Sequence, residues 1–310
     1  MQFFFAPVQG HTDAAYRHFH SKLYPDNITY FTPFIRLEKN DLRPKDLKDW
    51  KSTLNEGINL VPQIIFRNQE ELSRLVELLI QEGAAEINLN MGCPFPLQTG
   101  HGRGAATIAN EKLAVYVNDV ITSNPDILFS VKMRLGMTAK DEWHILLDAL
   151  NDTTLSHITL HPRIAKQQYG GVPDLEEFGK FIEESKNPVI YNGDIKTPDD
   201  MVRIKKMFPG IDGMMIGRGL LNRPSLVKEY NAGKEWNYKD RIINLLSFHN
   251  DLWKYYSDNL CGEAQIISKI QPFWEYSEQE IGRKAWKAIK KATNMAKYQT
   301  AVAIVQNSII

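Results

Sequence analysis

The sequence EINLNMGCPFPLQTGHGRGAA, residues 86–106, places a short strand directly before a side chain that can do chemistry. Ile87 and Leu89 alternate with asparagines, a pattern typical of a β-strand. Gly92 and two prolines then end the strand, so Cys93 is expected at its carboxyl end, at the start of a glycine-rich loop. A lone cysteine is commonly only a small buried hydrophobic residue. The residues at the ends of the other predicted strands are needed to distinguish a buried structural cysteine from a reactive thiol.

The rest of the first 233 residues repeats the same alternation of strand and helix. Further strand segments are predicted at residues 3–7, 28–35, 60–66, 128–133, 157–161, 188–191 and 213–216. They are mostly apolar, as parallel strands covered on both faces are. Eight strands separated by helices indicate an α/β fold, a (β/α)8 TIM barrel. An open doubly wound sheet is the alternative, and it is disfavoured because no GxGxxG motif follows the first strand.

The pattern changes after about residue 231, where strand-like runs stop and helical segments with aromatic anchors follow. We therefore predict a catalytic barrel domain over residues 1–233 and a small C-terminal helical bundle domain over residues 234–310. Residues 281–300 contain no acidic residue. Their basic residues are Arg283, Lys284, Lys287, Lys290, Lys291 and Lys297. Such a run is usually a solvated helix face, and the alternative is a strip that contacts RNA phosphates.

The composition limits the function classes. The chain has 37 basic and 37 acidic residues, which argues against a protein that coats nucleic acid through bulk charge and leaves only a local patch. Its two cysteines, Cys93 and Cys261, are far apart, which suits a reducing compartment and offers no CxxC metal pair. The first apolar run is too short for a signal peptide or a membrane span. We expect a cytoplasmic protein with no membrane, metal or obligate protein partner.

Polar side chains gather at the carboxyl ends of the predicted strands, where barrel enzymes keep their active sites. These are Gln63, Cys93, Lys132, His161, Asn192, Asp194 and Arg218. Residues 192–194 and 217–219 follow the last two strands and resemble the phosphate site of many barrels. Lys132 could stabilise negative charge on a reduced flavin, and Gln63 could bond its carbonyl and N–H. A barrel that binds a sugar phosphate remains an alternative on these residues alone.

Six sets of residues resemble the tRNA-dihydrouridine synthases and occur in that family's order across nearly all of the barrel. They are Ala6-Pro7-Val8 with Thr12-Asp13 and Arg17, Asn90 to Pro94, Val131 to Gly136, His161-Pro162-Arg163 with Gln168-Tyr169 and Gly171, Asn192 to Ile195, and Asp212 to Gly219. The resemblance implies FMN as cofactor, NADPH (or NADH) as hydride donor and a uridine of tRNA as substrate.

The resemblance also implies roles for single residues. Cys93 would be the catalytic acid. The flavin would be held by Pro7, Val8, Gln9, Gln63, Lys132, His161, Asn192, Gly193, Asp194, Gly217 and Arg218. The uridine and its tRNA would be contacted by Arg36, Asn90, Arg163 and Tyr169. Val8 replaces the methionine usual in the family, and His101 and Arg103 lie at positions that vary there, so they receive no role.

The implied chemistry suits a cysteine. Reducing the 5,6 double bond of uracil needs a hydride at C6 and a proton at C5, and a thiol near its ordinary pKa of about 8.5 is mostly protonated at neutral pH. The uridine must leave its stack to react. A D-loop uridine, at or near position 16, is the favoured target because the helical tail is closest to that subgroup.

Two other functions remain open at this point. One is a flavin barrel that reduces a free pyrimidine, similar to dihydroorotate or dihydropyrimidine dehydrogenases, which needs no basic tail. The other is a non-catalytic RNA-binding barrel, which predicts a colourless protein.

Overall fold

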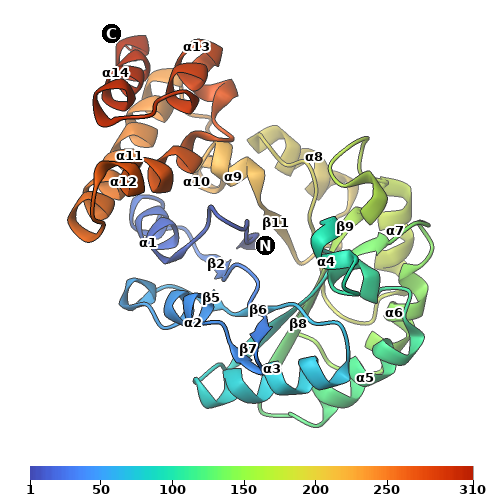
Figure 1. The fold of residues 1–310 in the computed structure, drawn as a ribbon. Coiled ribbons are helices and arrows are strands. Elements are labelled where there is room, and N and C mark those ends of the chain that lie inside the picture. Colours follow the sequence, from blue (N-terminus) through green and yellow to red (C-terminus); the bar gives the residue numbers. More distant parts are fainter. Residues whose placement is uncertain (310) are drawn as a thin grey trace.

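A closed barrel of parallel strands is the central feature of the computed structural model, which describes residues 1–309 (Figure 1). Its strands are β1 (Gln2–Phe5), β2 (Ile28–Phe31), β5 (Leu60–Val61), β6 (Gln63–Ile64), β7 (Glu86–Met91), β8 (Leu128–Gly136), β9 (His157–Ile164), β10 (Val189–Tyr191) and β11 (Gly213–Ile216). They are ordered β5-β2-β1-β11-β10-β9-β8-β7-β6. Because β5 and β6 are two pieces of one strand on either side of Pro62, β5 pairs with β2 and β6 pairs with β7, which closes the sheet. The predicted (β/α)8 barrel is confirmed.

Helices surround the barrel. They are α1 (Ala14–Leu23), α3 (Gln69–Gln81), α5 (Glu111–Thr122), α6 (Trp143–Leu150), α7 (Leu175–Glu184), α8 (Pro198–Met207), α9 (Arg218–Asn222) and α10 (Leu226–Ala232). Side chains of Asp13, Asn68 and Asn110 accept a hydrogen bond from the first turn of the helix that each precedes. These caps satisfy backbone N–H groups that have no partner inside the helix, so each helix begins at a residue that its own side chain marks.

Three details differ from the sequence prediction. β2 ends at Phe31, and beyond Pro33 only Ile35 forms an isolated bridge, to Ile64. The following segment folds into a hairpin of β3 (Leu37–Glu38) and β4 (Asp41–Leu42) and the helix α2 (Pro44–Trp50), none of which was predicted. Both β8 and β9 run three residues past their predicted ends.

The barrel interior has an apolar half and a polar half. Phe4, Ala6, Phe31, Val61, Ile190 and Met215 form a separate buried cluster contributed by β1, β2, β5, β10 and β11 and the residues that adjoin them. The other half carries Gln63, Asn88, Ser130 and Thr159, all buried, from β6 to β9. Because alternate residues of a strand point to opposite faces, the apolar residues between these polar ones pack outward against the helices. The chemistry-bearing side chains are therefore confined to one side of the interior.

The C-terminal region is helical, as predicted, and packs against α1 (Figure 1). Its helices are α11 (Tyr238–Asn259), α12 (Glu263–Ile270), α13 (Glu278–Lys290) and α14 (Met295–Gln306). The ring of Phe248 lies 4.8 Å from that of Tyr16 and 5.2 Å from that of Phe273, so one apolar core continues from barrel to tail. A domain boundary after Gly233 stays a prediction. Within residues 1–309, no helix is both long enough and apolar enough to cross a membrane.

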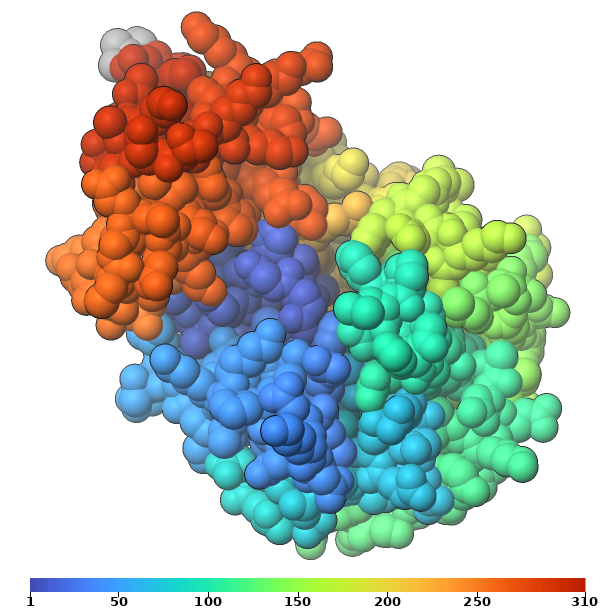
Figure 2. Space-filling model, viewed as in Figure 1, coloured from blue at the N-terminus to red at the C-terminus, as the bar shows by residue number. Residues whose placement is uncertain are grey.

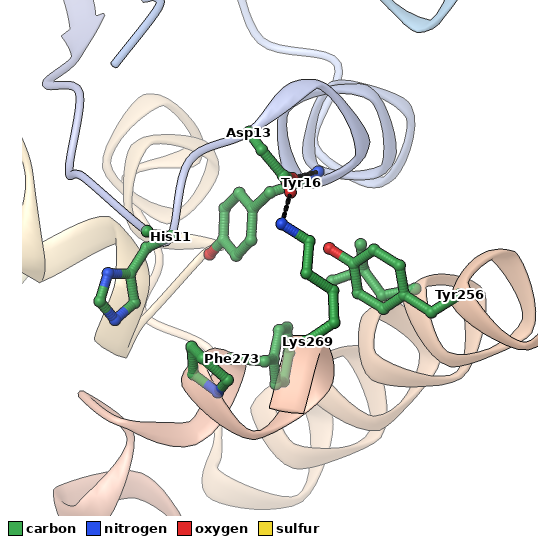
Figure 3. Close-up of a pocket in the computed structure, with 9 residues that line it drawn as sticks. His11, Asp13, Tyr16, Tyr256, Lys269 and Phe273 are labelled. Carbon is green, nitrogen blue, oxygen red and sulfur yellow. Dashed lines mark hydrogen bonds and ion pairs between the residues drawn. The ribbon is translucent and has the colours of Figure 1, made fainter. Parts of the chain in front are cut away.

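Polar contacts join the tail to the loop after β1 (Figure 3). The Lys269 ammonium lies 2.5 Å from the Asp13 carboxylate and 5.8 Å from the centre of the Tyr256 ring. His11 contacts Glu275 at 2.8 Å. Both pairs connect residues more than 250 positions apart, and they fix where the tail lies relative to the first strand end.

We expect Asp13→Ala to lower the free energy of unfolding by about 1–2 kcal/mol, because it removes both the α1 cap and the Lys269 ion pair. Asp13→Asn keeps the cap and should cost less than about 1 kcal/mol, as should Lys269→Met. Chemical denaturation of the three variants measures the two contributions. An asparagine variant as unstable as the alanine variant would contradict the capping role.

Candidate active site

A chain of side-chain hydrogen bonds runs through the polar half of the barrel to the backbone of Cys93. The Asn88 amide donates to Ser130 Oγ at 2.8 Å, and Gln63 Nε2 donates to Asn88 Oδ1 at 2.8 Å. Asn90 Nδ2 then donates to Gln63 Oε1 at 2.8 Å, while Asn90 Oδ1 accepts from the Cys93 N–H at 3.0 Å. Unpaired buried amides are costly, so this chain holds Gln63 and Asn90 in one arrangement and sets the position of Cys93.

The loop on the other side of the thiol is equally constrained. Gly104 has φ of 61°, and a Cβ there would lie 2.6 Å from the Cys93 carbonyl oxygen and 2.8 Å from the Cys93 Cβ. The Ala105 N–H donates to that carbonyl at 3.1 Å. Arg103, which the sequence left without a role, is buried in an ion pair with Glu71 at 2.6 Å. Only glycine fits at position 104, and the loop holds the thiol from both ends.

The environment of Cys93 keeps its thiol protonated. Burial raises the pKa of Cys93 above its ordinary value, and a hydrogen bond from the Phe95 N–H and the charges of Lys132 and Arg134 only partly offset this. A thiol with a raised pKa is a poor nucleophile at neutral pH but retains a proton that it can give.

Lys132 lies beside the cysteine loop, because the register of β7 and β8 pairs it with Asn90. Its side chain forms no ion pair with any carboxylate in residues 1–309. Burial lowers the pKa of Lys132 to about 7, with the Arg134 charge acting in the same direction and Cys93 opposing it. A half-buried lysine whose charged form is disfavoured by burial suits a ligand that brings negative charge and so favours the ammonium form.

Arg134 is a site residue that the sequence analysis missed. It is buried, and it donates to the Gly92 carbonyl at 3.0 Å and to the Ile164 carbonyl at 3.1 Å, which ties the cysteine loop to the end of β9. A signal was present, because Ser130, Lys132 and Arg134 alternate. The predicted strand stopped at residue 133, one residue too early for this pattern to be recognised.

A second cluster forms where β9, β10 and β11 end. Arg163 donates to His161 Nε2 at 3.1 Å and to both carboxylate oxygens of Asp194, at 2.5 and 3.0 Å. Arg218 lies 3.5 Å from Asp194, and its guanidinium carbon is 4.0 Å from the centre of the Tyr169 ring. Burial, together with the charges of Arg134 and other basic neighbours, holds the pKa of His161 well below its ordinary value, so the imidazole is neutral.

The residues predicted to contact tRNA lie in different environments. Tyr169 is exposed beside Arg218, whereas Arg163 is only 1% exposed and is occupied by internal bonds. Asn90 is bonded to the cysteine loop and to Gln63. Arg36 is half-buried on the same rim, after the bridge at Ile35. Their roles toward RNA stay predictions, and the internal bonds give Arg163 and Asn90 a positioning function first.

The loops after the first and last strands meet on the apolar side of the mouth. A Cβ at Gly217 would lie 3.4 Å from the Ala6 Cβ and 3.8 Å from Val8 Cγ2. The Val8 N–H donates to Thr12 Oγ1 at 2.9 Å, which orders the turn that contains Pro7. Gln9 is exposed and donates to the Phe34 carbonyl at 3.3 Å. Asn192 Nδ2 donates to the Met215 carbonyl at 2.8 Å, and Gly193 follows it in the same loop.

The charges at the mouth suit an anionic ligand. Lys132, Arg134, Arg163 and Arg218 meet there, and Asp194 is the carboxylate that the structure places in contact with Arg163 and Arg218. The surplus of positive charge matches a cofactor that carries a phosphate and gains negative charge on its ring when reduced.

Comparison with known proteins identifies the family. The sequence model described as "Dihydrouridine synthase (Dus)" matches residues 4–305. The chain belongs to the dihydrouridine synthase family. It is 27% identical over 282 residues to the "Probable tRNA-dihydrouridine synthase 2" of Bacillus subtilis, an alignment that covers 88% of this chain and 83% of the relative. It is 26% identical over 281 residues to the "Probable tRNA-dihydrouridine synthase" of Staphylococcus epidermidis, with the same two coverages.

Solved structures show the same barrel at low sequence similarity. Morphinone reductase superposes with a TM-score of 0.55 and 11% identity, over 76% of this chain and 87% of its own. Histamine dehydrogenase from a Rhizobium species also superposes with a TM-score of 0.55, at 12% identity, over 80% of this chain and 49% of its own. At these identities the likeness concerns the fold alone.

In this member of the dihydrouridine synthase family, the thiol loop and the lysine of β8 lie at the same end of the barrel. The sequence placed these residues at one rim from strand order alone. The structure adds the hydrogen bonds that hold them, and it shows Arg134, Asn88 and Gly104 as further parts of the site.

Alkylation of Cys93 should respond to pH according to its raised pKa. In a Cys261→Ser variant, where Cys93 is the remaining thiol, iodoacetamide should react slowly at neutral pH and accelerate only above the ordinary thiol pKa of about 8.5. The rate is measured by mass spectrometry across pH. A rate already maximal near pH 7 would show a thiolate and would contradict the acid role.

Proposed function

We propose that this protein is an FMN-dependent, NADPH-driven tRNA-dihydrouridine synthase that reduces the 5,6 double bond of a D-loop uridine in tRNA. The supporting observation is a protonated thiol, held by a rigid loop beside an unpaired lysine at the barrel mouth, in a member of this family. A tRNA substrate would also place the enzyme in the cytoplasm.

The cofactor would occupy the mouth between the apolar and polar halves of the barrel. Its ring and phosphate would be held by the cationic side chains of Lys132 and Arg218 and by residues 192–194. The other residues that would contact the cofactor are Pro7, Val8, Gln9, Gln63, His161 and Gly217. When bound, FMN would supply the hydride that C6 of the uracil receives, and NADPH (or NADH) would restore it.

Cys93 would complete the reduction by giving its proton to C5 of the uracil. The S–H bond breaks as the C5–H bond forms, and the resulting thiolate regains a proton from water. Lys132 and Arg134 both lower the pKa of this thiol, so they stabilise the thiolate at the moment it forms. Asn90 and Gly104 keep the sulfur in the direction that this transfer needs.

The variant Cys93→Ala tests this role directly. It should retain the yellow flavin and its reduction by NADPH, but form dihydrouridine at least about 100-fold more slowly, because general acid catalysis contributes about 10²–10⁴-fold. Cys261→Ala is the control and should leave the rate unchanged, since that residue is exposed in the tail. A full rate in Cys93→Ala on unmodified tRNA would refute the role of Cys93. A colourless wild-type protein would refute the flavin.

The tail would bind the tRNA backbone through its basic strip, defined as Arg283, Lys284, Lys287, Lys290 and Lys291. On α13, Ile281, Ala285 and Ile289 are buried, which leaves these basic side chains exposed on the other side of the helix and just past its end. Exposed lysines and arginines on one face suit phosphate contacts in a chain whose total charge is zero.

Replacing Lys284, Lys287 and Lys291 with glutamine should weaken tRNA binding and reduce the slope of log affinity against log salt by about 2–3, one counterion per lost phosphate contact. The matched control replaces Lys112, Lys186 and Lys206, which are exposed on the barrel. Binding is measured by fluorescence anisotropy at several salt concentrations. An unchanged slope would favour the free-pyrimidine alternative, which does not use the tail.

A further inference from the structure

Large apolar side chains stand exposed on the loop that follows the catalytic cysteine. Phe95 is 62% exposed and Leu97 is 72% exposed, and they flank Pro96 at the start of α4 (Pro96–Thr99). Isolated exposed apolar residues are common on protein surfaces. Phe95 and Leu97 lie only two positions apart and closely follow the proposed catalytic cysteine. Such a pair requires a specific explanation.

The loop that follows β9 also carries exposed apolar side chains. After β9, Tyr169 is 47% exposed and Val172 is 78% exposed. Arg134 connects the two loops, because it bonds the Gly92 carbonyl and its guanidinium carbon lies 5.6 Å from the centre of the Tyr169 ring. In Figure 2 the teal surface of the α4 segment lies beside the yellow-green surface of the segment that follows β9. The apolar residues therefore rise from adjacent loops at the mouth.

The absence of acidic residues from the loops after β7 and β9 favours RNA over protein as the partner of this apolar patch. Residues 94–104 and 164–173 contain no acidic residue, while they include His101 and Lys166. Arg67 adjoins the first loop, since a Cβ at Gly102 would lie 3.8 Å from its Cβ. A protein-binding patch has no need to exclude carboxylates, whereas a surface that approaches RNA phosphates does. Apolar side chains on loops without acidic residues suit unpaired bases stacked on side chains.

The Phe95 tip is also rigid. Pro94 and Pro96 restrict the backbone on both sides of it, and the Phe95 carbonyl accepts from the N–H groups of Gln98 and Thr99 at 2.8 and 3.0 Å. The loop is held at its far end by the Arg103 ion pair with Glu71. A rigid apolar side chain loses little entropy when it stacks against a base.

We propose that Phe95 and Leu97 insert into the RNA beside the extruded uridine and stack against the bases that it leaves. This inference rests on the proposed function, because it supposes that a uridine leaves its stack to enter the barrel. Apolar wedges of this kind compensate the stacking that base extrusion loses. The two residues would hold the opened RNA while Cys93, two positions before Phe95, meets the uridine.

The test compares Phe95→Ala/Leu97→Ala with Val115→Ala/Leu128→Ala. The control residues are 55% and 59% exposed, on α5 and at the amino end of β8, away from the mouth. The dissociation constant of an unmodified tRNA transcript should rise about tenfold in the first variant, as stacked bases lose contacts of this size. Its salt slope and its flavin content should not change, and the control should bind like the wild type. Phe95→Trp should retain binding.

The outcomes separate the two proposals. Unchanged tRNA affinity in Phe95→Ala/Leu97→Ala overturns the wedge, even if the wild type forms dihydrouridine. Wild-type protein that binds the transcript with a Phe95-dependent affinity but forms no dihydrouridine overturns the reaction instead. If sedimentation shows that the wild type is an oligomer and this variant a monomer, the patch joins two copies of the chain and the wedge is wrong.

Discussion

The Asn90 carboxamide is the constraint on which the active-site geometry depends. Its N–H donates to Gln63 and its oxygen accepts from the backbone of Cys93, so its two ends cannot be exchanged without breaking both bonds. Gln63 is held in turn by Asn88, which bonds Ser130. A buried polar group left without a partner costs about 1–3 kcal/mol. The position of the thiol is therefore set by residues deep in the barrel as well as by the constrained loop that carries it.

The division of the barrel interior explains how a protonated thiol and several cations lie in one site. Lys132 and Arg134 come from the polar half, where their charges lower the pKa of Cys93 and, in the case of Arg134, that of Lys132 as well. The opposite half presents Phe4, Ala6 and Met215, which bring no competing polar groups. A flat ring at the mouth would thus meet apolar packing on one side and charge on the other. The cations would act on the ligand, since Asp194 is already bonded to Arg163.

The sequence predicted the barrel well because its signals are local. Strand runs and the break after Gly92 depend on neighbouring residues only. The missed features depend on pairing. β9 continues through Pro162 because β10 ends at Tyr191, which pairs with Leu160, so the N–H that proline lacks has no ladder partner to lose. That extension buries Arg163, and the matching extension of β8 turns Arg134 inward. The carboxyl ends of β8 and β9 could not be predicted from the sequence of either strand alone.

The placement of the tail relative to the barrel was the feature least open to prediction from the sequence, although under the proposed function it would bear most on substrate choice. It rests on contacts between residues more than 250 positions apart, namely Asp13 with Lys269 and His11 with Glu275. His11 and Asp13 belong to the same segment as Pro7 and Val8, the loop after β1 that faces the mouth. A shift of the tail would therefore move the basic strip and strain the first strand end together. Under the proposed function, the choice of uridine would depend on this joint, because the barrel fixes the thiol and the joint fixes the tail.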